Sequence, residues 1–118
     1  MRPVLRRIHS PDIPDLRTFA PTASEPWCVY VQAMLGPDSG EGEESFGFTL
    51  CNHLWVSSQV KRSGSAWIGH SLVVEAFTFA ILERAITSLC SSIEGKDWQT
   101  VARRLASRTD WEFTNYTP

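Results

Sequence analysis

Histidines, cysteines and carboxylates are the residues of this chain that could do chemistry, and no spacing among them matches a catalytic motif. Nucleophilic catalysis needs a cysteine or serine beside a base, and the available bases are His9, His53 and His70. The chain has no Gly-x-Ser-x-Gly, and Ser63-Gly-Ser-Ala-Trp67 is typical of a turn that enters a strand. We therefore predict structural or surface roles for the histidines.

Metal and phosphate sites are not predicted either. Cys51-Asn-His53 offers two metal ligands, whereas a tetrahedral zinc site needs three or four and no second pair has ligand spacing. Residues 36–44 are rich in glycine but lack the lysine and Ser/Thr that hold phosphates, and their carboxylates would repel a nucleotide. Calcium suits those oxygens better, yet their spacing departs from that of an EF-hand. We expect no cofactor and no metal.

Two acids near the C-terminus, Asp110 and Glu112, could be imagined as a catalytic acid and base. In an extended segment, however, Trp111 and Phe113 would share one face while both acids point to solvent. We favour the structural interpretation, in which the two aromatic residues form a clasp that closes the core.

Charge is distributed unevenly along the 118 residues, although the net charge is only −2. Residues 10–60 hold seven acids against one base, which gives −6 and leaves +4 for the remainder. Four of these acids lie in the loop 36–44: Asp38, Glu41, Glu43 and Glu44. Such a loop is either a solvated acidic segment or a surface that steers a basic partner.

Composition sets the broad class of the protein. With 42% hydrophobic and 20% charged residues, the chain is long enough for one core, so we predict a single domain over residues 1–118. It shows neither the charge balance of a generic nucleic-acid-binding protein nor an apolar stretch suited to a signal peptide or membrane span. Three cysteines without a Cys-x-x-Cys pair favour a reduced, cytoplasmic location.

Hydrophobic patterning predicts strands in the first two thirds of the chain. Residues 27–35 and 46–51 have the composition and alternation of strands and would form a hairpin around loop 36–44. Residues 66–75 predict a third strand, and residues 4–8 an edge strand whose arginines would discourage aggregation. Residues 53–60 are ambiguous between a helical turn and a strand end.

Helical periodicity begins at Thr78 and continues to Gly95, which is placed to cap the helix end. Asp97 is a suitable N-cap for a second, shorter helix, whose apolar stripe includes Trp98, Val101 and Leu105. Strands first and helices last predict an α+β fold. We expect an antiparallel sheet of about four strands with a C-terminal helix pair packed on one face.

The order of these features resembles the immunity protein 8 family of bacterial polymorphic toxin systems. The resemblance rests on Ile8-His-Ser-Pro-Asp12, Gln32-Ala-Met-Leu-Gly-Pro37, Glu44-Ser-Phe-Gly-Phe48, Cys51, Leu54-Trp55, Ser71-Leu-Val-Val-Glu75, Gly95-Lys-Asp-Trp98, Ala102-Arg-Arg-Leu105 and Trp111-Glu-Phe113 to Tyr116. Asn115 stands where we expect an acid, and residues 60–70 depart from the family.

The resemblance implies a small, non-catalytic cytoplasmic protein that binds a cognate toxin domain and blocks it. It supplies no binding residues, so our hypothesis for the contact comes from charge: Asp38, Glu41, Glu43 and Glu44 would accelerate encounter with a basic toxin. A monomer or weak dimer would suffice. The alternative is a ligand- or protein-binding adaptor unrelated to toxins, and a third possibility is an enzyme that uses His70 with Asp110 and Glu112, which requires a deep pocket.

Overall fold

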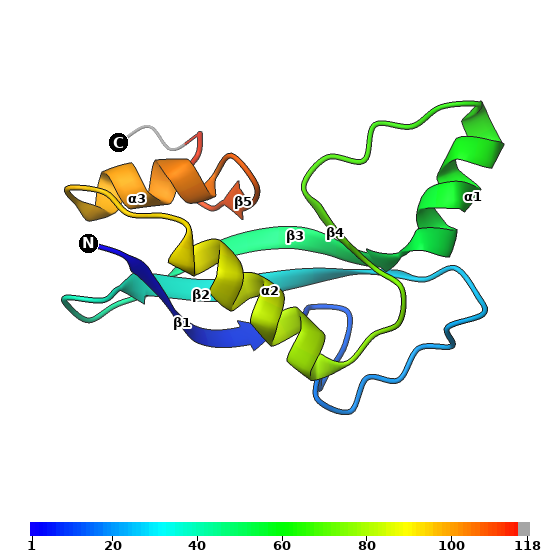
Figure 1. Ribbon diagram of the computed structural model, residues 1–118, viewed down its shortest axis with the longest axis horizontal. Coiled ribbons are helices and arrows are strands. Elements are labelled where there is room, and N and C mark those ends of the chain that lie inside the picture. Colours follow the sequence, from blue (N-terminus) through cyan, green and yellow to red (C-terminus); the bar gives the residue numbers. More distant parts are fainter. Residues whose placement is uncertain (116–118) are drawn as a thin grey trace.

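The computed structural model describes residues 1–115, which form five strands and three helices. In chain order the elements are β1 (Pro3–His9), β2 (Cys28–Pro37), β3 (Glu44–Asn52), α1 (His53–Ser63), β4 (Ser71–Val74), α2 (Phe79–Ser91), α3 (Trp98–Leu105) and β5 (Asp110–Trp111). They build an α+β structure around one core (Figure 1).

The hairpin of β2 and β3 is the centre of the sheet, and it confirms the hairpin expected from sequence. The two strands pair antiparallel, with Val31 opposite Phe48 and Leu35 opposite Glu44. Burial alternates along β2: Val31, Ala33 and Leu35 are buried, whereas the residues between them are partly exposed. One face of the hairpin therefore lines the core and the other faces outward.

The sheet is mixed, so the expectation of a purely antiparallel sheet is wrong. β1 pairs antiparallel with β2, β5 pairs antiparallel with β3, and β4 runs parallel to β3. The cause is α1, because β3 runs directly into this helix and residues 53–70 then carry the chain back to the start of a parallel strand. β4 is also shorter than predicted: residues 66–70 belong to this connection.

Residues 53–60, which the sequence left ambiguous, belong to helix α1. Asn52 is its N-cap, and the Asn52 Oδ1 accepts a 3.0 Å hydrogen bond from the Trp55 backbone N–H. Gly64 ends the helix in the left-handed region, at φ 80°. None of the eleven residues of α1, all of them described, is buried, and Figure 1 shows the helix standing away from the sheet at one end of the molecule.

Both C-terminal helices have a side-chain N-cap, of which the sequence predicted Asp97, whereas α2 does not end at the predicted cap. Thr78 Oγ1 accepts from the Ile81 N–H, and Asp97 Oδ1 accepts from the Thr100 N–H at 2.8 Å. α2 ends earlier than predicted, with Ser92 as its C-cap. Gly95 does not cap it: the Gly95 N–H instead donates to the carbonyl of Met1, which ties the connection to the start of β1.

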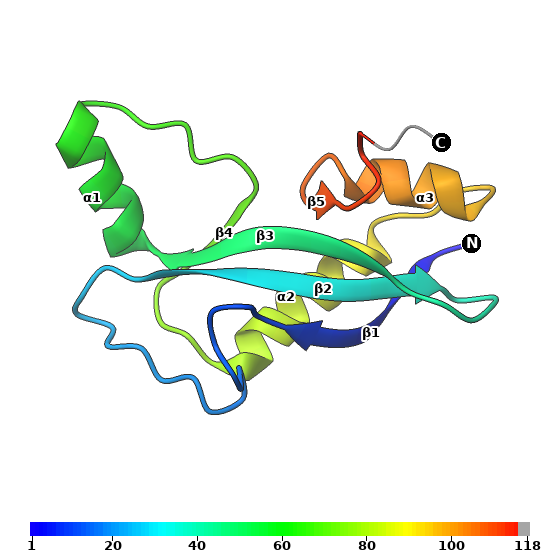
Figure 2. The ribbon, with the colours of Figure 1, turned by 180° about the vertical axis from the view of Figure 1, so that it is seen from behind.

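The core combines side chains of the sheet with side chains of α2 and α3. Leu82 and Ile86 of α2 and Val101 and Leu105 of α3 join the inward side chains of β2 and β3 in one buried cluster. Seen from behind in Figure 2, β2 and β3 lie in front of α2, so the opposite face of the sheet is turned to the viewer without a helix across it. Within residues 1–115, no helix is long and apolar enough to cross a membrane.

Candidate partner-binding surfaces

The acidic loop is fastened by arginines from the N-terminal strand. The Arg6 guanidinium donates to the carbonyls of Pro37 and Gly40, at 2.8 and 2.7 Å. Arg7 forms an ion pair of 2.7 Å with Glu43. Arg6 and Arg7 of β1, which the sequence suggested as protection against aggregation, therefore also hold the β2–β3 turn in place.

The four acids expected to bind a partner occupy different environments. Asp38 is exposed, and its Oδ1 accepts from the Arg2 backbone N–H at 3.1 Å. Glu41 is exposed and has no hydrogen-bond or ion-pair partner in the described part of the chain. Glu43 is paired with Arg7, and Glu44 is only partly exposed. Of the four carboxylates, Glu41 is thus the one most available to an incoming cation.

Glu44 joins two distant tryptophans. Its Oε1 accepts a 2.7 Å hydrogen bond from the Trp98 indole N–H and a 3.1 Å hydrogen bond from the Trp111 indole N–H. The rings of Trp98 and Trp111 also pack on Phe46, edge-on at 6.1 Å and stacked at 6.3 Å. This carboxylate satisfies both indole donors beside the core, a task that its place in an acidic run did not indicate.

The aromatic tail docks as expected at Trp111, which is 8% exposed. Its partner in the predicted clasp, Phe113, contacts the Trp111 ring edge-on at 6.0 Å but stays 37% exposed. Tyr116, part of the same predicted tail, lies outside the described residues.

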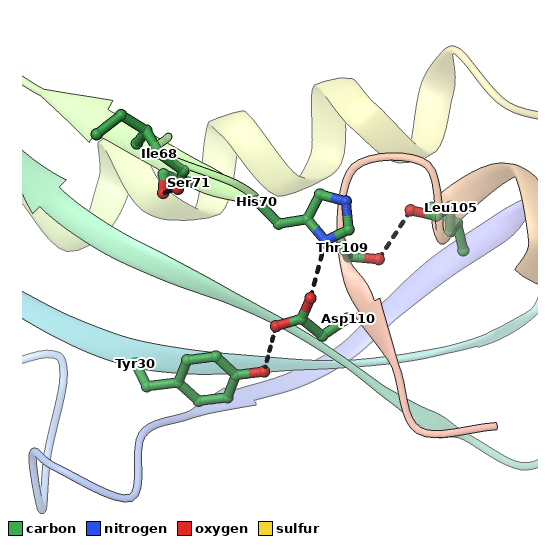
Figure 3. Close-up of polar contacts among 7 residues, drawn as sticks. All are labelled: Tyr30, Ile68, His70, Ser71, Leu105, Thr109 and Asp110. Carbon is green, nitrogen blue, oxygen red and sulfur yellow. Dashed lines mark hydrogen bonds and ion pairs between the residues drawn. The ribbon is translucent and has the colours of Figure 1, made fainter. Parts of the chain in front are cut away.

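A polar network links the C-terminal strand to the middle of the sheet (Figure 3). The Tyr30 hydroxyl donates to Asp110 Oδ2 at 3.0 Å, and His70 Nδ1 lies 2.8 Å from Asp110 Oδ1. Asp110 thus faces solvent, as expected, yet holds two partners from β2 and from the segment before β4. Burial first, and then the hydrogen bond to Asp110, raise the pKa of Tyr30 to about 12.

Gly47 makes room for this network. A Cβ atom at Gly47 would lie 2.0 Å from the Tyr30 hydroxyl oxygen, so the tyrosine ring crosses β3 directly over the glycine. Asp110 is the register partner of Gly47 in β5, which places its carboxylate at the end of the ring. The spacing of these three residues follows from strand register, which sequence alone did not supply.

A second row of hydrogen-bonded polar side chains lies on the same face of the sheet as Tyr30. His9 Nε2 is 2.9 Å from Gln32 Oε1, and the Gln32 amide donates to Ser45 Oγ at 3.3 Å. His9 and Gln32 are register partners on β1 and β2. The third histidine, His53, is exposed at the first position of α1.

The arrangement of His70, Asp110 and Glu112 differs from the catalytic pocket that the enzyme hypothesis required. The side chains of His70 and Asp110 are 37% and 56% exposed. Glu112 is engaged elsewhere, since its Oε1 accepts from the Ser45 backbone N–H at 2.7 Å. Among residues 1–115, no three histidine, cysteine or acidic side chains gather as ligands for a metal ion.

Comparison with protein families shows which family the chain belongs to. The family model described as Immunity protein 8 matches residues 3–116, nearly the whole chain. The chain belongs to the immunity protein 8 family. Searches of curated proteins and of solved structures found no match.

Membership in the immunity protein 8 family confirms the resemblance seen in the sequence. The match spans the acidic hairpin, the Glu44–Trp98–Trp111 contact and the Tyr30–Asp110–His70 network. It also spans residues 60–70, where the motif resemblance was weakest.

Sequence reasoning missed the most exposed large hydrophobic side chain among residues 1–115 of this immunity protein. Trp67, in the loop between α1 and β4, is fully exposed at 103% of its reference area. Gly64 and Gly69, on either side of Trp67, both have positive φ angles. The backbone of this loop therefore favours glycine at these two positions. A tryptophan between glycines was the available signal, and it was interpreted only as part of a strand.

Proposed function

We propose that this chain binds a cognate toxin domain and neutralises it by steric and electrostatic blocking. The observation that carries the proposal is the family match over residues 3–116. Inhibition by occupation needs a complementary surface and no reactive group, and the exposed positions of His70 and Asp110 suit that requirement. We place this activity in the cytoplasm, with the immunity protein as a monomer or weak dimer and without catalysis of its own.

The acidic loop remains our proposed contact, through Asp38, Glu41, Glu43 and Glu44. Its four carboxylates are accompanied by the guanidinium groups of Arg6 and Arg7, which reduces the charge of the loop region to about −2. Long-range steering is therefore weaker than the sequence suggests, and we assign most of it to Glu41. Glu44 contributes indirectly, since it fixes the base of the hairpin against Trp98.

The test is growth rescue together with binding. The toxin domain encoded beside this gene is expressed in a sensitive host with and without the immunity protein, and the two purified proteins are mixed and separated by size. We expect rescue and a stable complex. If both proteins are folded and neither binding nor protection occurs, the proposal is wrong and the adaptor hypothesis takes its place.

Charge reversal tests the acidic loop within that assay. Glu41→Lys should slow association in stopped-flow measurements and flatten its dependence on salt, because rim charges act mainly on the association rate. Glu75→Lys, with the same change of charge beyond the end of β4, is the matched control. Equal association rates for Glu41→Lys and wild type would show that the acidic loop does not contact the toxin domain.

A further inference from the structure

The sheet face opposite α2 presents an organised polar surface. We call it the open sheet face and define it by Arg7, His9, Tyr30, Gln32, His70 and Asp110. Tyr30 and Gln32 alternate with the buried Val31 and Ala33, so their side chains point away from the core. Figure 2 shows the strands from this side, with α2 behind them.

The open sheet face is pre-organised for binding. Tyr30, Asp110 and His70 are joined by hydrogen bonds of 3.0 and 2.8 Å, and Figure 3 shows the tyrosine and histidine converging on the carboxylate. Gln32 is held between His9 and Ser45. Side chains that are already fixed lose little rotamer entropy when a partner arrives, which lowers the cost of association.

Trp67 offers an apolar anchor in the loop that leads to His70. It lies three residues before His70, so their Cα atoms are at most about 11 Å apart. His70 is tied to Asp110, which holds this end of the loop against the open sheet face. A fully exposed tryptophan gains most by burial in a partner, and tryptophan and tyrosine are the residues most enriched among interface hot spots.

Charge indicates the chemistry of the partner. On and beside the open sheet face, Glu43, Asp110 and Glu112 stand against Arg7, which gives −2 with neutral histidines. Other exposed cations lie on the helices: Lys61 and Arg62 in the last turn of α1, Arg84 on α2, and Arg103 and Arg104 on α3. A two-fold dimer through the open sheet face would bring two acidic surfaces together, which disfavours a second copy as the occupant.

We infer that the open sheet face, with Trp67 as its anchor, docks a lysine- and arginine-rich surface of the toxin domain. This inference rests on the proposed function and specifies the contact that performs it. The acidic loop would then lie at the rim of the interface and the Tyr30–Asp110–His70 network near its centre.

Two variants test the docking surface directly. Trp67→Ala removes the anchor from an exposed loop, and Asp110→Asn removes the central charge while it keeps the size of the side chain. We expect the affinity for the toxin domain, measured by calorimetry, to fall about 30-fold or more for Trp67→Ala and about tenfold for Asp110→Asn. Ile81→Ser, on the exposed side of α2, is the control and should leave affinity unchanged.

The outcomes separate this inference from the proposed function. If wild type neither binds nor protects, the proposed function fails and the inference with it. If wild type binds and both variants bind equally well while thermal melting shows them folded, the inference is overturned and the proposed function stands. A wild-type dimer that Trp67→Ala converts to a monomer with unchanged toxin affinity would assign the surface to self-association and overturn the inference as well.

Discussion

The carboxylate of Glu44 and the indole N–H of Trp98, 54 positions apart in the chain, form a 2.7 Å hydrogen bond. The same oxygen accepts from Trp111, so a single side chain at the start of β3 secures both α3 and β5. The acidic loop therefore ends in a residue that stabilises the fold.

Replacing this carboxylate should destabilise the protein. Glu44→Leu leaves two partly buried indole donors without an acceptor, and we expect the free energy of unfolding to fall by about 1–3 kcal/mol. Glu44→Gln retains an acceptor oxygen and should lose less. Urea denaturation followed by tryptophan fluorescence measures both, with Glu41→Gln as the control. Equal stability of Glu44→Leu and wild type would show that the two hydrogen bonds add nothing.

The close approach of Tyr30 to Gly47 predicts an unusual double-mutant result. Gly47→Ala forces the tyrosine ring away and breaks its hydrogen bond to Asp110, which should cost about 1–3 kcal/mol of stability. In a Tyr30→Ser background the same glycine substitution meets no ring, and most of that cost should disappear. A double-mutant cycle by chemical denaturation measures the difference. If the stability changes of Gly47→Ala and Tyr30→Ser are purely additive, the close approach of the tyrosine ring to Gly47 is contradicted.

Acid titration should reveal the N-cap of α3. The hydrogen bonds of the Asp97 carboxylate with Thr100 are the main cause of its lowered pKa. A carboxyl group whose pKa is lower in the folded state stabilises the fold above its unfolded pKa of 3.8, and this stabilisation is lost as pH falls through the folded pKa. The stability difference between wild type and Asp97→Asn should therefore shrink below about pH 4. Thermal melts between pH 2 and 7 measure it, and a constant difference would rule out this role.

Thiol reactivity should follow burial. The pKa values of Cys51 and Cys90 rise to about 11 because both thiols are buried, and that of the exposed Cys28 is raised by partial burial and by Asp12. Raised values mean little thiolate at pH 8, so alkylation of the native protein should be slow at all three thiols and fastest at Cys28. Mass spectrometry after a short pulse of iodoacetamide should find Cys28 labelled first, and all three in urea. Preferential labelling of Cys90 would contradict the packing of α2.

The sequence was sufficient where a local pattern determines structure. The composition of residues 27–35 and the alternation in residues 46–51 predicted the hairpin. The change of period at Thr78 and the N-cap Asp97 marked the two helix starts, because periodicity and caps act over a few residues. The direction of β4 was missed because it depends on α1, whose residues pack too little on the sheet to show a strong apolar stripe. Gly95 was predicted as the cap of α2, but its N–H donates to the Met1 carbonyl, a contact between distant parts of the chain that local periodicity does not show.

In the candidate binding surfaces, too, local sequence patterns showed some features, and contacts between distant residues determine the others. The acidic run was visible as composition, but the partners Arg6 and Arg7 are brought to it only by strand pairing. The Tyr30–Asp110–His70 network combines three separate parts of the chain, and no spacing rule joins positions that far apart. Trp67 lay in a segment assigned to a strand, and its exposure follows from the loop that replaces that strand.

Two strands that follow β3 in the sequence pair with its outer edge. β4 pairs with the second half of β3, and β5 pairs with the first half. Because β5 comes from residues 110 and 111, the hairpin can form during synthesis well before the strand that completes the first half of this edge. A nascent copy would thus carry Phe46 and an unpaired strand edge until residues 110 and 111 have been made. Under the proposed function, the interval between making the hairpin and having a closed sheet edge is then set by the synthesis of the residues that separate β3 from β5.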